Sequence, residues 1–486
     1  MTFELFDFRF KLKPVGITFA PAFIITVPVD KVKGLLVVLI VMSVKAVTVL
    51  FFKIKGVLSA VKLTSLLIVT VPVFKRKGSA EGISVIEVAA TPTRPISNIK
   101  LLVSYKKEVI EDYFGDGSEF SASIEYIVED VPRGTAGALM DALPKLSEQF
   151  LVLYGDTFFD IDLASFWTFH QKKLGDVSIF LHPNDHPHDS DLVEVDSSFQ
   201  VQKIHPYPHD AQWRQNLVNA AVYIFNKKSI KEINFIPGRP DIAKDLFPLM
   251  IELKRKLYGY ISTEYIKDMG TPQRLAKVKS DINFGKVVLL RNKTPKIAIF
   301  LDRDGTINKE VEHLSSLEDF ELINGVGGAI RQINAAGILA VVVTNQPVIA
   351  RGELQETELQ LIHNKMDTLL GREGAYLDRL YYCPHHTDIG FKGEVEALKF
   401  NCDCRKPKTG MIMQAKKDLN VNLQKSWVIG DSTRDIFAAK NAGMRSVLVQ
   451  TGHAGKDESY KVEPDFIAED LNGAVHLIMQ EIKYDC

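Results

Sequence analysis

Cysteine is scarce in this sequence, with only four residues among 486. Secreted domains that depend on disulfides contain many more cysteines for their length, so a disulfide framework is excluded here. Cys383, Cys402 and Cys404 lie close together, and Cys486 stands alone at the end of the chain. This usage favours a reducing compartment, and we expect a cytoplasmic protein.

The sequence also lacks an excess of charge of either sign. The formal net charge is -1 and the isoelectric point is near 6.9. Binding to nucleic acid through overall charge is therefore not expected. The sequence gives no indication of oligomeric state, and the partners expected from the motifs below are small molecules.

Long uninterrupted apolar runs are missing as well. Lysines break the apolar text near the N-terminus, and the run at 34–44 is too short to span a bilayer. A signal peptide does not fit, because no short basic start leads into one apolar core and a small-residue cleavage site. A segment lying on a membrane surface is the alternative for this region.

Acidic residues are absent between Asp30 and Glu81, whereas lysine recurs throughout that stretch. Its Val-, Leu- and Ile-rich text differs from the rest of the chain, and the change comes near residue 96. We treat 1–95 as an atypical hydrophobic and basic segment.

The strongest chemical signal is a pair of aspartates after an apolar run. Residues 297–301 read as a buried strand, which Asp302 and Asp304 follow, with Gly305 allowing a tight turn. At the end of a strand both carboxylates can reach one pocket. One carboxylate can attack phosphorus and hold a divalent cation, while the other transfers a proton. The alternative is an acidic turn without chemistry.

Further polar side chains follow apolar runs in the same part of the chain. They are Thr344 and Asn345 after 341–343, Asp431 after 428–430, and the cations Arg405 and Lys406. The carboxyl ends of parallel strands meet at one edge of a sheet, so these groups can form one site. Hydroxyl, amide, cationic and carboxylate groups together suit a phosphate ester bound with a metal ion.

In this order the segments resemble the motifs of the haloacid dehalogenase-like phosphatases, over about 296–486. The resemblance implies a doubly wound parallel sheet and Mg²⁺ held by Asp302, Asp431 and the carbonyl of Asp304. It makes Asp302 the nucleophile and Asp304 the general acid and then the base. Thr344 and Lys406 would hold the phosphoryl group, and the substrate would be bound by Asn345 and Arg405.

A second metal set lies in the same region. Cys383 and His385, followed by Cys402 and Cys404, give a C-x-H … C-x-C pattern suited to tetrahedral Zn²⁺. The alternative is two unrelated groups of buried cysteines. The pattern resembles that of the D-glycero-D-manno-heptose 1,7-bisphosphate 7-phosphatases, with the histidinol-phosphate phosphatases as the nearest siblings. We expect a structural zinc that fixes the Arg405 loop over the active site.

From residue 96 strands alternate with helices, which favours a mostly parallel sheet. Strands are expected at 98–105, 124–128 and 150–154, and helices at 107–113 and 134–146. This part, 96–282, resembles the sugar-1-phosphate nucleotidyltransferases, and that family has a Rossmann-like mixed sheet.

The nucleotidyltransferase resemblance also implies site residues. Gly134 would lie against the nucleobase, and Asn219 and Lys244 would contact the sugar phosphate. Asp156 and Asp268 would bind Mg²⁺ with a nucleoside triphosphate. Two carboxylates and a lysine suit a reaction that depends on positioning and charge neutralisation.

One part of the nucleotidyltransferase pattern is missing. The family begins with a strand and a glycine-rich phosphate loop, but nothing before residue 96 resembles either, and the nearest text, Thr93-Arg94-Pro95, lacks the glycines. Either the first domain is a degenerate scaffold, or residues before about 95 come from the wrong reading frame. We favour the frame error and expect an impaired transferase.

The sequence thus divides into 1–95, a nucleotidyltransferase-like domain at 96–282, a polar linker at 283–295 and a phosphatase domain at 296–486. Two α/β domains would act on consecutive steps that make a nucleotide-activated heptose for surface polysaccharide, with GTP as the expected donor. The alternatives are a histidinol-phosphate phosphatase or a non-catalytic sensor of sugar nucleotides.

Overall fold

The computed structural model describes residues 39–43, 46–50, 83–86, 98–104, 106–210, 212–233 and 238–484. The reading-frame and membrane-surface alternatives concern 1–95, most of which lies outside these residues, as does Cys486. No helix in the described part of the chain is long and apolar enough to cross a bilayer.

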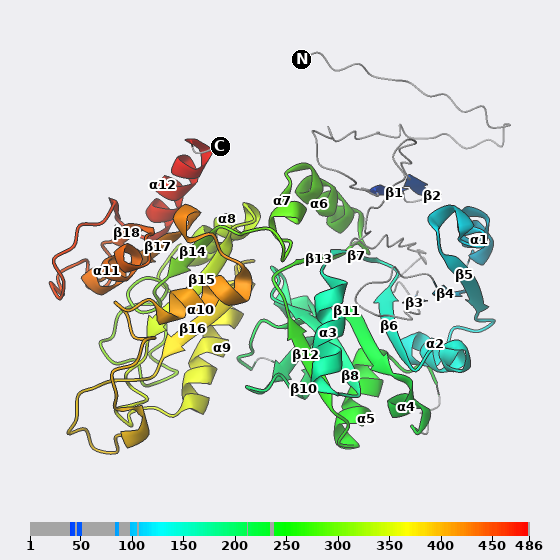
Figure 1. Ribbon diagram of the computed structural model, residues 1–486, viewed down its shortest axis with the longest axis horizontal. Coiled ribbons are helices and arrows are strands. Elements are labelled where there is room, and N and C mark those ends of the chain that lie inside the picture. The colour runs from blue at the N-terminus through cyan, green and yellow to red at the C-terminus, as the bar shows by residue number, and fades with distance from the viewer. Residues whose placement is uncertain are drawn as a thin grey trace, which may run out of the picture.

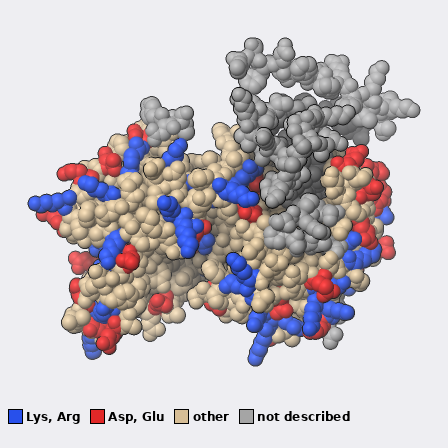
Figure 2. All heavy atoms as spheres, viewed as in Figure 1, with Lys and Arg blue, Asp and Glu red and all other residues tan. Residues whose placement is uncertain are grey.

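Two α/β lobes lie side by side (Figure 1). The N-terminal lobe contains the cyan and green elements up to α7, and the C-terminal lobe contains the yellow to red elements with β14, β15 and α8. Acidic and basic side chains are interspersed over the face shown in Figure 2, in agreement with the balanced composition. The two-lobed α/β architecture confirms the expected fold class.

The N-terminal lobe is built on a nine-stranded sheet with a main path in the order β10-β9-β11-β6-β3-β4-β5. β8 extends the sheet from β11, and β12 from β8. Its strands are β3 (Ile83–Ile86), β4 (Asn98–Val103), β5 (Ser123–Val128), β6 (Gln149–Tyr154), β8 (Val177–His182), β9 (Leu192–Val195), β10 (Val201–His205), β11 (Val218–Asn226) and β12 (Leu257–Ile261).

The sheet is mixed, as the family resemblance implied, and the expectation of a mostly parallel sheet was wrong for this lobe. Only the β4–β5 and β8–β12 pairs are parallel. The long strand β11 runs antiparallel to both β6 and β8, and β9 with β10 forms a hairpin. The alternation of strands and helices in the sequence does not show which neighbouring strands are antiparallel, because the connections are about as long as those between parallel strands.

The remaining elements of this lobe complete its two faces. They are the strands β7 (Thr157–Asp160) and β13 (Tyr265–Asp268), which pair with each other, and the helices α1 (Lys107–Phe114), α2 (Gly134–Ala142), α3 (Leu163–Lys173), α4 (Lys227–Lys231), α5 (Phe247–Glu252), α6 (Pro272–Asn283) and α7 (Lys286–Leu289). A separate hairpin joins β1 (Leu39–Ser43) to β2 (Ala46–Leu50).

Strand β3 lies within the segment 1–95 and pairs antiparallel with both β4 and β6. It therefore lies between β4 and β6 in the sheet. The domain boundary near residue 96 stays a prediction, because pairing of one strand does not define a domain.

The C-terminal lobe contains a six-stranded, all-parallel sheet in the order β16-β15-β14-β17-β18-β19. Its strands are β14 (Ala298–Leu301), β15 (Leu339–Asn345), β16 (Arg379–Cys383), β17 (Trp427–Gly430), β18 (Arg445–Val449) and β19 (Phe466–Ala468). Its helices are α8 (Val326–Ala335), α9 (Glu356–Arg372), α10 (Gly410–Leu419), α11 (Thr433–Asn441) and α12 (Leu471–Tyr484). The chain order reverses between β14 and β17, where doubly wound sheets bind their ligands.

Alternation along β14 explains how helices cover both faces of this sheet. Ile299 and Leu301 pack in one core with α8, α9 and α12, whereas Ala298 and Phe300 pack in the other with α10 and α11. Successive strand residues point to opposite faces, so a strand buried on both faces must be apolar throughout. The apolar runs at 297–301, 341–343 and 428–430 are confirmed as the strands β14, β15 and β17.

The two lobes share a polar and aromatic interface along α9. The Arg214 amide donates to the Thr368 hydroxyl (3.0 Å), and the Asn216 amide donates to Asp367 (3.2 Å). Lys365 and Arg372 both lie over the Trp213 ring, with their cationic groups 5.7 and 5.2 Å from its centroid. Cations over an indole face add to the burial of the ring.

The end of α9 also contacts the N-terminal lobe at Gly371. A Cβ atom on Gly371 would lie 2.4 Å from Cγ of Pro187, so the two lobes approach closely here. Gly371→Ala in the full chain should therefore lower the free energy of unfolding by about 1–3 kcal/mol through overpacking. Denaturant unfolding followed by circular dichroism measures this change.

The matched control is Gly328→Ala, since Gly328 lies in α8 and a Cβ atom there would meet open space. Relief of the helix cost of glycine should stabilise this control by about 0.5–1 kcal/mol. Equal effects of the two substitutions would contradict the packed lobe interface.

Candidate active site

The first part of the site is the turn after β14, which carries Asp302 and Asp304. The Asp302 amide donates to the carbonyl of Ile429 (3.0 Å), so the turn stays hydrogen-bonded to β17. Gly305 has a φ of +72°, and a Cβ atom there would lie 2.3 Å from Oδ2 of Asp431. Only glycine both adopts this backbone and leaves room for the neighbouring carboxylate.

Lys406 is buried between two carboxylates. Its Nζ lies 2.8 Å from Oδ2 of Asp302 and 2.6 Å from Oδ1 of Asp435. Burial acts to lower the pKa of Lys406, but the two negative charges hold this pKa above its ordinary value. The lysine is therefore a fixed positive charge beside Asp302.

Asp435 was not among the predicted site residues, yet it is fully buried at the centre of the site. It begins α11 as part of a capping box, in which the Ser432 hydroxyl donates to Oδ2 of Asp435 (2.7 Å). Burial opposes ionisation, but Lys406 and these hydrogen bonds hold the pKa of Asp435 below its ordinary value. As the third residue of α11 it both caps the helix and faces Lys406.

Asp431, at the end of β17, completes a group of three carboxylates. Asp302, Asp431 and Asp435 each offer an oxygen, and these atoms lie within 4.8 Å of one another. Burial raises the pKa of Asp302 to about 7 and that of Asp431 to about 8, with a further increase from neighbouring carboxylates. One lysine cannot neutralise three carboxylates, so the group fits a divalent cation such as Mg²⁺.

The carboxylate of Asp304 points instead to Arg303, whose side chain is fully buried. Nη2 of Arg303 donates to both carboxylate oxygens (2.9 Å each), and Nε2 of Gln346 donates to one of them (2.8 Å). Burial alone would raise the pKa of Asp304, but Arg303 and the hydrogen bonds hold this pKa below its ordinary value. Arg303 and Gln346 were not predicted, because neither is among the polar residues that the sequence analysis selected after the apolar runs.

The predicted residues at the end of β15 lie beside this group. The Thr344 hydroxyl accepts from Nε2 of Gln346 (2.8 Å). Asn345 accepts from the Lys406 amide (2.9 Å) and donates to the Lys406 carbonyl (3.1 Å). Asn345 therefore fixes the peptide of Lys406, and its contact with substrate stays a prediction.

The four predicted zinc ligands lie together in the C-terminal lobe. The sulfur atoms of Cys383, Cys402 and Cys404 are 3.2–3.4 Å apart, and Nδ1 of His385 is 3.2 Å from Sγ of Cys404. Three thiols and an imidazole gathered within 4.8 Å of one another form a set of four side chains that could hold a metal ion. Arg405 follows directly and donates to the carbonyl of His385 (3.3 Å).

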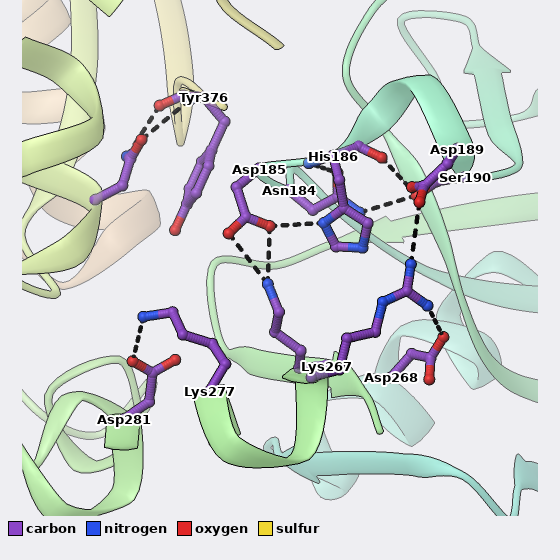
Figure 3. Close-up of polar contacts among 12 residues, drawn as sticks. Asn184, Asp185, His186, Asp189, Ser190, Lys267, Asp268, Lys277, Asp281 and Tyr376 are labelled. Carbon is purple, nitrogen blue, oxygen red and sulfur yellow. Dashed lines mark hydrogen bonds and ion pairs between the residues drawn. The ribbon is translucent and has the colours of Figure 1, made fainter. Parts of the chain in front are cut away.

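In the N-terminal lobe, Asp156 and Asp268 lie on neighbouring positions of the β7–β13 pair. Asp268 pairs with Thr157, the residue after Asp156, and the Met269 amide donates to the Asp156 carbonyl (2.7 Å). Burial and the charge of Asp268 raise the pKa of Asp156 to about 6. Figure 3 shows Asp268 at one end of a polar cluster that includes Asp189.

The other predicted residues of this lobe lie on separate elements. Gly134 begins α2 with a φ of +74°, and Asn219 donates to the Tyr223 hydroxyl (2.9 Å). Nζ of Lys244 donates to the carbonyl of Tyr207 (3.1 Å). None of the hydrogen bonds of these described side chains joins Asn219 or Lys244 to the two aspartates.

Comparison with known proteins assigns the two lobes. A family model described as nucleotidyl transferase matches residues 84–284, and one described as HAD-hydrolase-like matches residues 403–474. The D-glycero-beta-D-manno-heptose-1,7-bisphosphate 7-phosphatase of Haemophilus ducreyi is 43% identical over 185 residues, which cover 38% of this chain and 97% of the relative.

Two solved structures give smaller similarities. The D,D-heptose 1,7-bisphosphate phosphatase of B. bronchiseptica, complexed with magnesium and phosphate, is 32% identical with a TM-score of 0.34, covering 38% of this chain and 99% of its own. HddC from Yersinia pseudotuberculosis is 23% identical with a TM-score of 0.34, covering 38% of this chain and 79% of its own.

The chain is thus an enzyme, a phosphoric monoester hydrolase fused to a nucleotidyl transferase domain. Its C-terminal lobe makes this chain a member of the D-glycero-beta-D-manno-heptose-1,7-bisphosphate 7-phosphatase family.

Proposed function

We propose that the C-terminal lobe removes the 7-phosphate of D-glycero-D-manno-heptose 1,7-bisphosphate in a Mg²⁺-dependent reaction through an aspartyl-phosphate. The observation that carries the proposal is the convergence of Asp302, Lys406, Asp431 and Asp435 at the carboxyl edge of β14 and β17. The relative from Haemophilus ducreyi supports the choice of substrate.

Each residue has a distinct part in the proposed reaction. An oxygen of Asp302 forms a bond to phosphorus as the bond from phosphorus to the sugar oxygen breaks, and Asp304 transfers a proton to that oxygen. Lys406 and Thr344 hold the phosphoryl oxygens, and Arg405 contacts the rest of the substrate. Bound Mg²⁺, held by Asp302, Asp431 and the carbonyl of Asp304, would neutralise the charge of the phosphoryl group.

Hydrolysis of the aspartyl-phosphate needs a base, and this step suits Asp304 as the structure has it. With Arg303 and Gln346 as its partners the carboxylate is ionised and can take a proton from water. To protonate the sugar oxygen, Asp304 must first gain a proton. Arg303 therefore favours the second half of the reaction over the first.

The Cys383, His385, Cys402 and Cys404 set is proposed to hold a structural zinc. Four protein ligands leave no open position for substrate. The site would join β16 to the segment that carries Arg405 and Lys406, which links zinc binding to substrate binding.

The N-terminal lobe is proposed to retain only weak transfer of a nucleotide to heptose 1-phosphate, with GTP as donor. Asp156 and Asp268 would bind Mg²⁺, Gly134 would face the base, and Asn219 and Lys244 the sugar phosphate. No glycine-rich phosphate loop precedes these elements in the described residues. The two reactions would together supply a nucleotide-activated heptose for surface polysaccharide in the cytoplasm.

Replacement of the nucleophile tests the phosphatase. Asp302→Asn should reduce hydrolysis of heptose 1,7-bisphosphate by about 10³-fold or more, because the covalent route is lost. Release of inorganic phosphate measures the rate. Asp403→Asn is the control, since that side chain is fully exposed. A rate equal to that of the parent in Asp302→Asn would show that another residue attacks phosphorus.

Metal analysis tests the zinc site. The purified chain should contain one zinc, and Cys402→Ser should lose it and bind substrate more weakly, because the Arg405 loop loosens before the sheet unfolds. Cys486→Ser, at the fourth cysteine, should keep the metal. The assignment fails if no zinc is found in the parent, or if Cys402→Ser keeps full zinc content and affinity.

The transferase is tested by pyrophosphate release. We assay full-length protein with heptose 1-phosphate, Mg²⁺ and each nucleoside triphosphate. Turnover should be slower by orders of magnitude than that of a transferase with the glycine-rich loop, because no backbone amides of such a loop orient the triphosphate. Phosphatase activity in the same preparation shows that the protein is folded. Rapid turnover would mean that residues 1–95 provide a working phosphate loop.

A further inference from the structure

Arg274, on α6, lies at the two aspartates that the N-terminal lobe would use for a metal ion. Its Nη1 donates to Oδ2 of Asp268, and its Nη2 donates to Oδ2 of Asp189 (3.1 Å). The positive charge of Arg274 also acts on Asp156 and opposes the rise in its pKa. A guanidinium group therefore stands where the two carboxylates converge.

Both oxygens of Asp268 already have donors, because Oδ1 accepts from the Gly270 amide and Oδ2 from Arg274. A nearby carboxylate, Asp185, is not free to act as a third ligand, since Lys267 donates to both its oxygens (2.8 and 3.1 Å) (Figure 3). In the described part of the chain, every group of three or more metal-competent side chains lies in the C-terminal lobe. The residues present thus fit a cation poorly unless Arg274 moves.

The second anchor of Arg274 restricts that movement. Asp189 ends the short helix Pro187–Asp189, whose Pro187 packs against Gly371 of α9 in the other lobe. Arg274 is thereby held by one carboxylate of the candidate metal pair and by a segment fixed at the lobe interface. Charge-assisted hydrogen bonds of this kind are stronger and more specific than neutral ones.

We propose that Arg274 is an internal cation for the Asp156–Asp268 pair, which stabilises these carboxylates without a divalent ion and competes with one. The inference rests on the proposed role of the two aspartates and adds a way in which binding of metal there is regulated. Arg274 would balance the charge of these carboxylates when no magnesium nucleotide is bound. It is independent of any turnover.

Binding of Mn²⁺ to the full chain tests this inference. Titrations followed by the electron paramagnetic resonance of free Mn²⁺ count the bound ions. The parent should bind one ion, in the phosphatase site, and Arg274→Gln should bind a second with at least about tenfold higher affinity than the same site in the parent, since a like charge has been removed. Adding Asp156→Asn to Arg274→Gln should abolish the second ion.

The matched control is Arg255→Gln, because Arg255 forms an ion pair with Glu232 (2.8 Å) in the same lobe. Asp189→Asn removes only the second anchor, so it should also raise the affinity, and it serves if Arg274→Gln does not fold. The inference is overturned if neither variant gains Mn²⁺, or if the parent binds, as tightly as Arg274→Gln does, an ion that Asp156→Asn removes. A slow or fast transferase leaves these counts unchanged, so failure of the proposed function is seen separately.

Discussion

The C-terminal lobe depends on one electrostatic constraint: three carboxylates converge where a single buried lysine, Lys406, pairs with two of them. Asp302, Asp431 and Asp435 converge because β14 and β17 are neighbours in the sheet and α11 begins directly after β17. Burial makes ionisation of all three costly, so the site needs a second positive charge. In the reaction proposed above, a divalent cation would supply this charge beside Lys406.

The scaffold around this site explains its precision. β14 is apolar on both faces, and the cores on either side leave the strand little freedom to shift. Gly305 permits the close approach of Asp431, and Asn345 fixes the peptide that presents Lys406. Side chains from distant parts of the sequence are thus held by packing and by backbone hydrogen bonds, a combination that suits preorganised catalysis.

The N-terminal lobe shows a different balance of charges. Asp156 and Asp268 again lie close together, but an arginine from the next helix faces them. In the C-terminal lobe three carboxylates have one lysine to balance their charge, whereas in the N-terminal lobe both oxygens of Asp268 accept hydrogen bonds from the chain itself. The shared interface along α9 holds the two lobes together, although the carboxylates of their sites are balanced in different ways.

The sequence by itself determined several strands of the C-terminal lobe and which side chains gather beside Cys383. Apolar runs predicted β14, β15 and β17, and the C-x-H … C-x-C spacing predicted which side chains gather around Cys383. These features are local or follow from strand ends that meet at one edge of a sheet.

Tertiary structure alone decided the partners of those residues. Asp435 was not among the predicted site residues, and the contacts of Asp435, Arg303 and Arg274 with charged partners appear only in the folded chain. The antiparallel course of β11 was likewise hidden, because chain spacing does not fix strand direction. The physical reason is that local pattern specifies conformation, whereas pairing of buried charges depends on distances between residues far apart in the chain.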